Sequence, residues 1–169
     1  MWRKCLTILV VFFTIGQAQD DTTLVRIGQT VPDFKVTTLD GKIFDIKDCR
    51  GKIILLNFFA TWCGPCLQEM PHLETEIWQK YKNDGLVVLA IGREHTAVQL
   101  DTFRQENKFS FQIAPDPQRK IYSLFATVYI PRNILIDRDG RIIYLSIGYD
   151  KKEFALLADL IGQKLKAGK

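Results

Sequence analysis

The stretch NFFATWCGPCLQEMPH, residues 57–72, decides how the chain folds. It begins inside an apolar run and leads into two cysteines, Cys63 and Cys66, with only Gly64 and Pro65 between them. Two cysteines at this spacing serve as a structural disulfide, as half of a metal site, or as a dithiol that opens and closes during a reaction. The elements on either side of the pair help to choose among these three readings.

A buried strand is expected before the cysteines and a helix after them. The run IILLNFF, residues 53–59, is apolar without alternation, which is typical of a strand that is covered on both faces. After the cysteines, apolar residues recur at helical spacing and predict a helix over about residues 65–82, with a kink at Pro71. The apolar positions of this helix are Leu67, Met70, Leu73, Ile77 and Trp78.

The remaining strands are expected as two hairpins and two single runs. Alternating residues around Asp40–Gly41 predict a hairpin over residues 33–46. Apolar runs predict strands at residues 86–91 and 109–113, and a second hairpin is expected at residues 133–147. Aromatic side chains that fit the core are Phe58, Phe59, Phe103 and Phe125.

Three further helices are expected from capping residues and apolar spacing. Residues 96–99 have the spacing of a capping box and predict a helix that ends near Asn107. Asp116, followed by proline, is expected to start another helix. Its apolar positions are Ile121, Leu124 and Phe125. Asp150 should cap a last amphipathic helix, residues 154–165.

This order of elements predicts an α/β fold. Strands that alternate with helices and end in a hairpin and a helix imply a central mixed sheet with helices on both faces. The cysteine pair then lies at the carboxyl end of a central strand, where open α/β sheets place their functional sites. The length of 169 residues fits one domain, which we assign to residues 24–169 and expect to be a monomer. The net charge of +4 is too small to indicate a nucleic-acid partner.

The first segment, residues 1–18, has the pattern of a signal peptide. It has a basic start, an apolar middle and small residues near its end, so cleavage is expected after Ala18. The alternative is an uncleaved membrane anchor, although the apolar stretch is shorter than the ~20 residues that cross a bilayer comfortably. Either reading predicts a periplasmic or otherwise exported domain. The cysteines that remain in it, Cys49, Cys63 and Cys66, do not look like a disulfide framework.

The chemistry expected of the pair is thiol–disulfide exchange. At the start of a helix, unpaired backbone N–H groups and the positive end of the helix dipole favour a thiolate at Cys63. A thiol with a pKa of about 8.5 is ~3% ionised at neutral pH, and lowering the pKa to about 7 raises that fraction to ~50%. Cys63 is therefore expected to attack a disulfide of a partner, and Cys66 to resolve the mixed disulfide.

The motif WCGPC, residues 62–66, matches the thioredoxin active site. From Phe34 to Leu165 the chain resembles the exported thioredoxin-like disulfide reductases of the TlpA and ResA kind, which are related to the redoxin and AhpC/TSA proteins. The resemblance includes an added strand–helix unit around residues 92–113. It implies a thioredoxin-like fold, a redox-active Cys63–Cys66 disulfide and no cofactor.

The resemblance also implies a surface for substrates. Pro131 matches the cis-proline that faces the cysteines in this family, and the backbone of Ile130 would pair with an extended substrate segment. Trp62, Gly64 and Pro65 are expected to complete the contact surface. The implied substrates are disulfide-containing proteins, with apocytochrome c as one candidate, and a membrane thiol donor would supply electrons. The Gly64–Pro65 pair is that of reducing thioredoxins, which favours reduction over oxidation.

Three positions bear on proton transfer and on the rim of the site. Asn57 stands where cytoplasmic thioredoxins have a buried aspartate, and it cannot titrate. Glu69 matches a glutamate of the exported reductases and lies one turn from Cys66, so it is expected to take the proton of that thiol. The alternative is a solvated acid that the helix dipole favours. Arg132 replaces the usual threonine after the proline, and either reaches the rim, where it favours the Cys63 thiolate or acidic partners, or is solvated.

Two alternative functions are kept open. A thiol peroxidase would need a proline at Leu56 and a threonine or serine at Ala60, and neither is present. A metal or copper chaperone on the same scaffold would use histidines beside the cysteines, but we expect His72 and His95 at the surface and no metal site. Cys49 is expected to be a small, partly buried residue rather than a third redox thiol.

Overall fold

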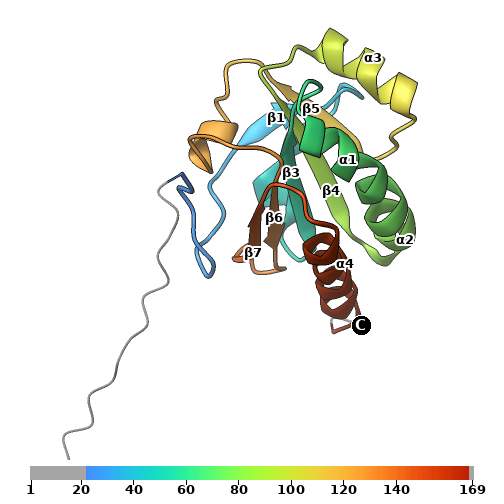
Figure 1. Cartoon of the computed structure of the whole chain (residues 1–169). Coiled ribbons are helices and arrows are strands. Elements are labelled where there is room, and N and C mark those ends of the chain that lie inside the picture. The colour runs from blue at the N-terminus through green and yellow to red at the C-terminus, as the bar shows by residue number, and fades with distance from the viewer. Residues whose placement is uncertain (1–21, 168–169) are drawn as a thin grey trace, which may run out of the picture.

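The computed structural model describes residues 22–167, which enclose a central five-stranded sheet (Figure 1). The strands stand in the order β5-β4-β3-β6-β7, and the first three of these are parallel to one another. β6 and β7 run antiparallel to their neighbours, so the sheet is mixed as predicted. The strands are β3 (Ile54–Phe59), β4 (Val87–Arg93), β5 (Gln112–Asp116), β6 (Arg132–Ile136) and β7 (Ile142–Ile147).

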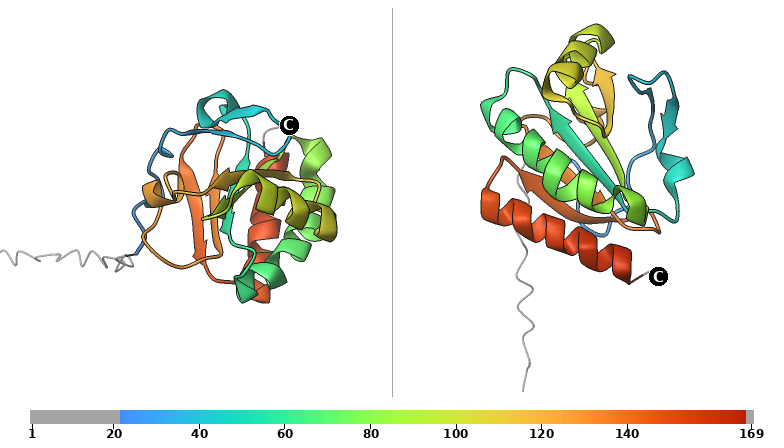
Figure 2. Two further views of the ribbon diagram at one scale, coloured as in Figure 1. Left: turned by 90° about the horizontal axis from the view of Figure 1, so that it is seen from above. Right: turned by 90° about the vertical axis from the view of Figure 1, so that its right-hand side faces the viewer.

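One face of the sheet is covered by α-helices (Figure 2). Leu55 and Phe59 of β3 point to this face and share a core cluster with buried residues of each α-helix in the described part of the chain. Leu100 places the added helix α3 against Gly92 of β4, where a side chain on the glycine would collide with it. The helices are α1 (Gly64–His72), α2 (Gln79–Tyr81), α3 (Ala97–Asn107) and α4 (Lys151–Lys166).

The opposite face is covered by the amino-terminal hairpin and by short turns. The hairpin consists of β1 (Lys35–Thr37) and β2 (Ile43–Asp45), and a 3-10 helix, η1 (Ile46–Cys49), follows it. Ile54, Leu56 and Phe58 of β3 pack into this second cluster. Helices were expected on both faces of the sheet. The described α-helices all contribute to the first cluster, so this second face has only 3-10 turns.

The helix predicted to start at Asp116 does not form. Asp116 is instead the last residue of β5, and its carboxylate accepts hydrogen bonds from the backbone N–H groups of Ile121 (3.0 Å) and Tyr122 (2.8 Å). Arg119 has a φ of 58°, in the left-handed region, which is incompatible with a right-handed helix at that point. The aspartate therefore organises a turn, and only the 3-10 helix η4 (Tyr122–Leu124) follows.

The long helix after the cysteines is irregular just beyond Pro71, the residue at which a kink was predicted. α1 ends at His72, and a π-helical segment, η2 (Leu73–Trp78), continues it into α2 and the 3-10 turn η3 (Lys82–Asp84). Proline has no N–H to donate, and a π-helical segment is one of the ways in which a helix accommodates a break in its hydrogen-bond ladder. Leu73 and Ile77 remain fully buried on this segment.

The other expected elements are present with small shifts of their ends. Thr96 and Gln99 form both hydrogen bonds of the capping box at the start of α3. Asp150 caps α4 by accepting from the N–H groups of Lys152 and Glu153. The strand predicted at residues 109–113 lies slightly later in the chain, as β5. The segment 1–18 lies outside the described residues, and no helix within 22–167 is long and apolar enough to span a membrane.

Candidate active site

The two cysteines lie where β3 passes into α1. Cys63 is the N-cap residue of α1, and its Sγ accepts a hydrogen bond from the backbone N–H of Cys66 at 3.3 Å. A disulfide joins the two side chains. β3 is buried along its whole length, which fixes the position of the turn that follows it. The sulfur of Cys63 therefore occupies the amino-terminal tip of a helix, where negative charge is stabilised.

The two sulfurs differ in access to solvent. Cys63 is 7% exposed, whereas Cys66 is completely buried. Trp62 is 60% exposed, and Gly64 and Pro65 are exposed as well. A partner can therefore reach the pair from the Cys63 side only.

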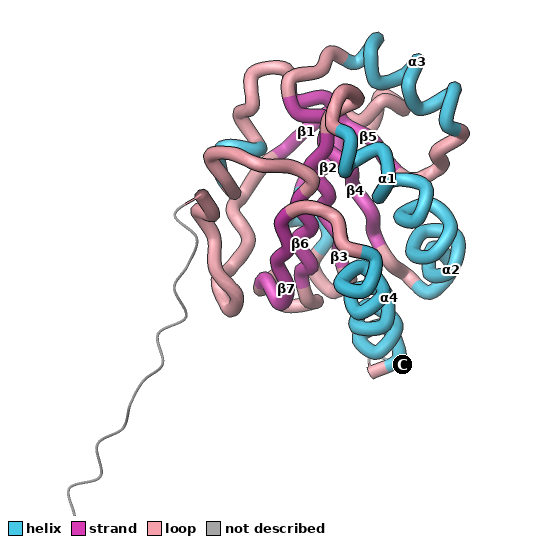
Figure 3. The backbone as a smooth tube through the Cα atoms, viewed as in Figure 1, coloured by secondary structure: helices cyan, strands magenta, loops and turns pink. Residues whose placement is uncertain are grey.

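The loop before β6 lies at the same end of the central strands as the start of α1 (Figure 3), which Cys63 caps. β6 is antiparallel to β3, and Arg132 at its start stands opposite Phe58 near the end of β3. The Ile130–Pro131 peptide bond is cis, as predicted, and the carbonyl oxygen of Ile130 lies 3.7 Å from the Sγ of Cys63. The backbone of Ile130 thus lies directly beside the disulfide.

Glu69 is buried in a network of two asparagines. It is 1% exposed, which rules out the alternative of a solvated acid. Asn57 donates from Nδ2 to Oε1 of Glu69 (2.6 Å), and Asn133 donates from Nδ2 to Oε2 (2.9 Å). Asn57 and Asn133 stand directly opposite each other on β3 and β6, and a 2.9 Å hydrogen bond joins their side chains. The central strands therefore hold both carboxylate oxygens of Glu69.

This environment shifts the titration of Glu69 into the neutral range. Burial raises the pKa of its carboxyl group from 4.5 to about 7, and the hydrogen bonds from Asn133 and Asn57 oppose the shift because they stabilise the carboxylate. A group that titrates near neutral pH both accepts and releases a proton readily. Positions i and i+3 share a helix face, which places Glu69 on the same side of α1 as Cys66.

A small pocket leads from Glu69 to the surface. Glu69 and Asn133 form its inner end, and Ser146 and Tyr149 lie on its walls. The pocket has room for about one water molecule. It opens near the start of α4 rather than beside Trp62, so protons can reach Glu69 without crossing the surface that faces a substrate.

His95 was predicted to lie at the surface, but it is buried. It is 4% exposed, and its Nε2 accepts a hydrogen bond from the backbone N–H of Thr61 at 3.0 Å. Because Nε2 is the acceptor, the ring is neutral with its proton on Nδ1. Burial lowers the pKa of His95. The added unit that contains α3 thus supports the turn that leads to Cys63. His72 is partly exposed, as expected, and lies 2.6 Å from Glu76.

Two arginines near the site have contacts that the sequence did not predict. Arg132 is 2% exposed, so it neither reaches the rim of the site nor is solvated. Arg93, which the sequence does not single out, places its guanidinium between the rings of Trp62 (5.6 Å) and Tyr122 (5.0 Å). These cation–π contacts hold the exposed indole against the protein. Asn133 was also missed, although its place on a strand opposite Asn57 is a signal that could have identified it.

The third cysteine of the described chain is separate from the pair. Cys49 is a free, buried residue of the second core cluster, and burial raises the pKa of its thiol. A small, partly buried residue was expected here, and Cys49 is more fully buried than that. Within residues 22–167, no three histidine, cysteine or acidic side chains gather in a way that could hold a metal ion.

Comparison with known proteins identifies related sequences over most of the chain. A model of the AhpC/TSA family matches residues 27–145. The chain is 36% identical over 133 residues to the thiol-disulfide oxidoreductase ResA of Bacillus cereus, and the match spans 79% of this chain and 76% of the relative. It is 32% identical over 147 residues to ResA of Geobacillus thermodenitrificans, with coverages of 87% and 80%.

Solved structures show the same fold. A solution structure from Bacteroides thetaiotaomicron, assigned as a protein disulfide isomerase, has a TM-score of 0.82 and 37% identity, and the match covers 86% of this chain and 93% of that one. A crystal structure from Chlorobium tepidum, assigned as a thiol:disulfide interchange protein DsbE, has a TM-score of 0.73 and 27% identity, with coverages of 83% and 99%. The thioredoxin-like fold predicted from the sequence is confirmed.

The raised pKa of Glu69 predicts a pH-dependent stability. Between 4.5 and about 7 the folded protein binds the proton of this carboxyl more tightly than the unfolded chain does. The contribution of Glu69 to the free energy of unfolding of the oxidised protein should therefore fall as pH rises through this window, by about 3 kcal/mol for the full shift. Urea unfolding of wild type and Glu69→Gln at several pH values measures it. The difference between wild type and Glu69→Gln should show this decline, whereas the difference between wild type and the exposed control Glu106→Gln should not. Identical profiles of wild type and Glu69→Gln would contradict the assignment.

The hydrogen bond between His95 and Thr61 predicts a graded effect of substitution. His95→Leu leaves the N–H of Thr61 without its acceptor and should lower the free energy of unfolding near neutral pH by about 1–3 kcal/mol. His95→Gln offers a carboxamide oxygen in place of Nε2 and should lose less. Because the pKa of His95 is lowered from 6.5 in the folded state, the stability that wild type has over either variant should also shrink as pH falls below that value. Equal stability of the two variants would show that the hydrogen bond is unimportant.

Proposed function

The chain belongs to the AhpC/TSA family, among the thiol–disulfide oxidoreductases related to ResA, and we propose that its reaction is the reduction of disulfides in other proteins. One observation carries the proposal: Cys63 caps α1 beside the backbone of Ile130, while Cys66 is buried behind it. This arrangement presents one sulfur to a partner and keeps the second for an internal step. The Gly64–Pro65 pair favours the reducing direction.

The first step joins the protein to its substrate. The thiolate of Cys63 attacks one sulfur of the substrate disulfide and forms a mixed disulfide. The other substrate sulfur leaves as a thiolate and takes a proton from solvent. The N–H groups in the first turn of α1, which have no partner within the helix, stabilise the attacking thiolate. The N–H of Cys66 is one of these groups, and it donates to the sulfur of Cys63.

The second step releases the reduced substrate. Cys66 gives its proton to the carboxylate of Glu69, and the resulting thiolate attacks the sulfur of Cys63. The Cys63–Cys66 disulfide forms and the second substrate sulfur leaves as a thiolate, so two electrons have passed to the substrate. Glu69 then returns its proton to water through the pocket at its side. A carboxyl group with a pKa of about 7 is suited to both transfers.

Substrate recognition uses backbone and exposed apolar surface. We assign the pairing of an extended substrate segment to Ile130 and Pro131, because main-chain hydrogen bonds give affinity with little dependence on sequence. Trp62, Gly64 and Pro65 add the exposed surface beside Cys63. Such a site accepts unfolded or extended proteins more readily than a compact partner.

The cellular setting follows from the first segment of the chain. Residues 1–18 have the sequence pattern of a signal peptide, with an uncleaved anchor as the alternative, and either one places the domain outside the cytoplasm. An exported reductant needs a supply of electrons, because its surroundings are oxidising, and we assign this supply to a membrane thiol donor. Apocytochrome c, whose cysteines must be reduced before haem is attached, is a candidate substrate.

A trapping experiment tests the proposed reaction. Cys66→Ser cannot resolve the mixed disulfide, so it should accumulate covalent adducts with exported proteins through Cys63, and its turnover should fall to about one per cent of wild type or less. Non-reducing electrophoresis and mass spectrometry detect the adducts. Cys63→Ser should form none, and Cys49→Ser should behave as wild type. Capture of nothing by Cys66→Ser, while the wild-type dithiol cycles with small disulfides, would overturn the protein-reductase assignment.

A further inference from the structure

Arg132 makes an unusual set of contacts for a buried arginine. Its Nε donates to the carbonyl oxygens of Val128 and Tyr129, both at 3.1 Å, and its Nη2 donates to Val128 at 2.7 Å. On its other side, Nη1 donates to Oγ1 of Thr23 and Nη2 to Oγ1 of Thr22, both at 2.8 Å. The planar guanidinium therefore joins the loop before the cis-proline to the start of the described chain.

The loop that Arg132 holds is the one that faces the disulfide. Residues 128–130 form no strand or helix, and their backbone oxygens need partners from elsewhere. Arg132 supplies donors for two of these oxygens, and the hydroxyl of Tyr122 donates to Tyr129 as well (2.8 Å). The third, that of Ile130, remains beside the Sγ of Cys63.

Val128 and Tyr129, whose carbonyl oxygens are held on the inside, expose their side chains, whereas Ile130 packs against the core. Tyr129 has a φ of 68°, a left-handed conformation that is costly for a residue other than glycine and that the surrounding bonds must maintain. Its side chain is 62% exposed, and that of Val128 is 41% exposed. The loop thus offers apolar and aromatic surface next to the backbone of Ile130.

The amino-terminal segment completes the support of this loop. The N–H of Thr127 donates to the carbonyl of Thr22 (2.9 Å), and the N–H of Leu24 donates to Phe125 (2.8 Å). Thr23 forms a β-bridge with Ala126. The residues that follow the expected cleavage point therefore pair with the stretch that leads into the loop, and Arg132 ties the two together.

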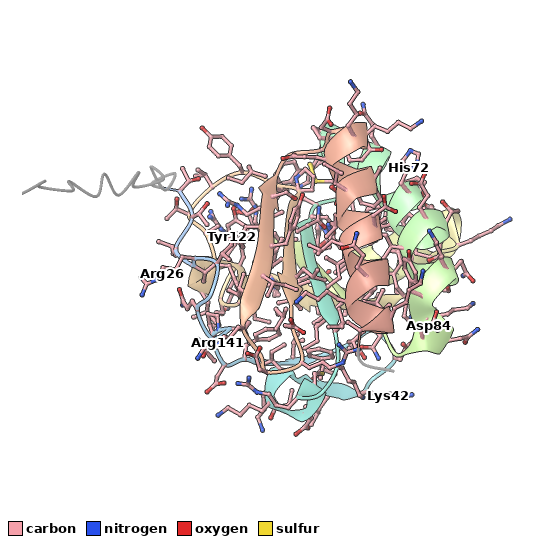
Figure 4. The ribbon with its side chains drawn as sticks, turned by 90° about the horizontal axis from the view of Figure 1, so that it is seen from below. Arg26, Lys42, His72, Asp84, Tyr122 and Arg141 are labelled. Carbon is pink, nitrogen blue, oxygen red and sulfur yellow. A yellow bond between two sulfur atoms is a disulfide. The ribbon has the colours of Figure 1, made fainter. Side chains whose placement is uncertain are left out.

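The sheet separates this support from the proton acceptor. Successive residues of a strand point to opposite faces, so Arg132 points to the side of the hairpin and Asn133 to the side of α1 and Glu69. Tyr122, which helps to hold the loop, lies on the side of the sheet away from α1 (Figure 4). Two neighbouring residues after the cis-proline thus serve different parts of the reaction.

We propose that Arg132, together with Thr22 and Thr23, is a clamp that holds residues 128–130 in the geometry that binds extended protein substrates. The proposal rests on the function proposed above. Arg132 is a positioning residue: it acts through the loop and does not touch the sulfurs. Its loss should impair reactions that use the loop and spare the exchange chemistry of the dithiol.

The test compares two substrates of the reduced full chain. The second-order rate constant is measured for an extended peptide that contains a disulfide and for hydroxyethyl disulfide, which is too small to span the loop. Arg132→Met should lower the rate constant for the peptide about tenfold and that for the small disulfide by no more than about twofold, since only the peptide gains from a preformed loop. The reduction potential of the pair should stay at the wild-type value.

Further variants keep the test decisive if Arg132→Met folds poorly. Arg132→Lys keeps the charge but lacks the fork that reaches two carbonyls and two hydroxyls, so the rate constant for the peptide should fall nearly as far. Thr23→Val removes one acceptor and should give a smaller, peptide-specific loss. Arg138→Met is the matched control. Like Arg132, Arg138 joins distant segments through its guanidinium, which donates to the carbonyl oxygens of Lys164 and Leu165. It should leave both rate constants unchanged.

The outcomes separate the clamp from the proposed function. Suppose that wild type reduces the peptide. If the Arg132 variants then lose equal factors in the rate constants for both substrates, or lose nothing in the rate constant for the peptide, the clamp is overturned. If wild type reduces hydroxyethyl disulfide but not the peptide, the protein-reductase function itself is overturned and the clamp with it. A peptide-specific loss in Arg132→Met and Thr23→Val, with Arg138→Met unchanged, supports both.

Discussion

The capping of α1 by the sulfur of Cys63 is the interaction on which the rest of the site depends. A buried strand delivers the cysteine to the tip of the helix, and there its Sγ accepts the N–H of Cys66. The same free N–H groups that favour an accepting sulfur favour a thiolate once the disulfide opens. Fold and reactivity are therefore linked by one hydrogen-bonding requirement, that of the first turn of a helix.

The central strands then divide the supporting tasks between the two faces of the sheet. On the face of α1, Asn57 and Asn133 hold Glu69 in a buried position where its carboxyl titrates near neutral pH. On the other face, Arg132 holds the loop that faces the sulfurs. Proton transfer and substrate contact are thus supported by separate sets of residues on the two faces of the sheet.

Local patterns in the sequence were enough to predict most of the fold and to identify Cys63 and Cys66 as the reacting pair. The capping box at Thr96 and the motif around Cys63 each depend on residues within one helical turn, so their structures follow from local chemistry. The helix expected at Asp116 failed because the carboxylate accepts from N–H groups five and six residues on, which builds a turn instead.

The residues that the sequence misplaced owe their roles to distant partners. His95 meets Thr61, which is 34 residues away, and Arg132 meets Thr22, which is 110 residues away. Neither contact leaves a periodic or short-range pattern in the sequence. Polar residues of this kind look solvated until the sheet brings their partners together, whereas apolar positions reveal their burial through spacing alone.

The most direct test of this account is the ionisation of Cys63 in the reduced protein. The rate of alkylation of Cys63, followed by mass spectrometry of its peptide as pH is varied, reports the pKa of this thiol. Capping of α1 predicts a pKa well below the ordinary value of about 8.5. If Cys63 stays protonated well above pH 8, its pKa is that of an ordinary free cysteine. This result would contradict the central role given to the helix start.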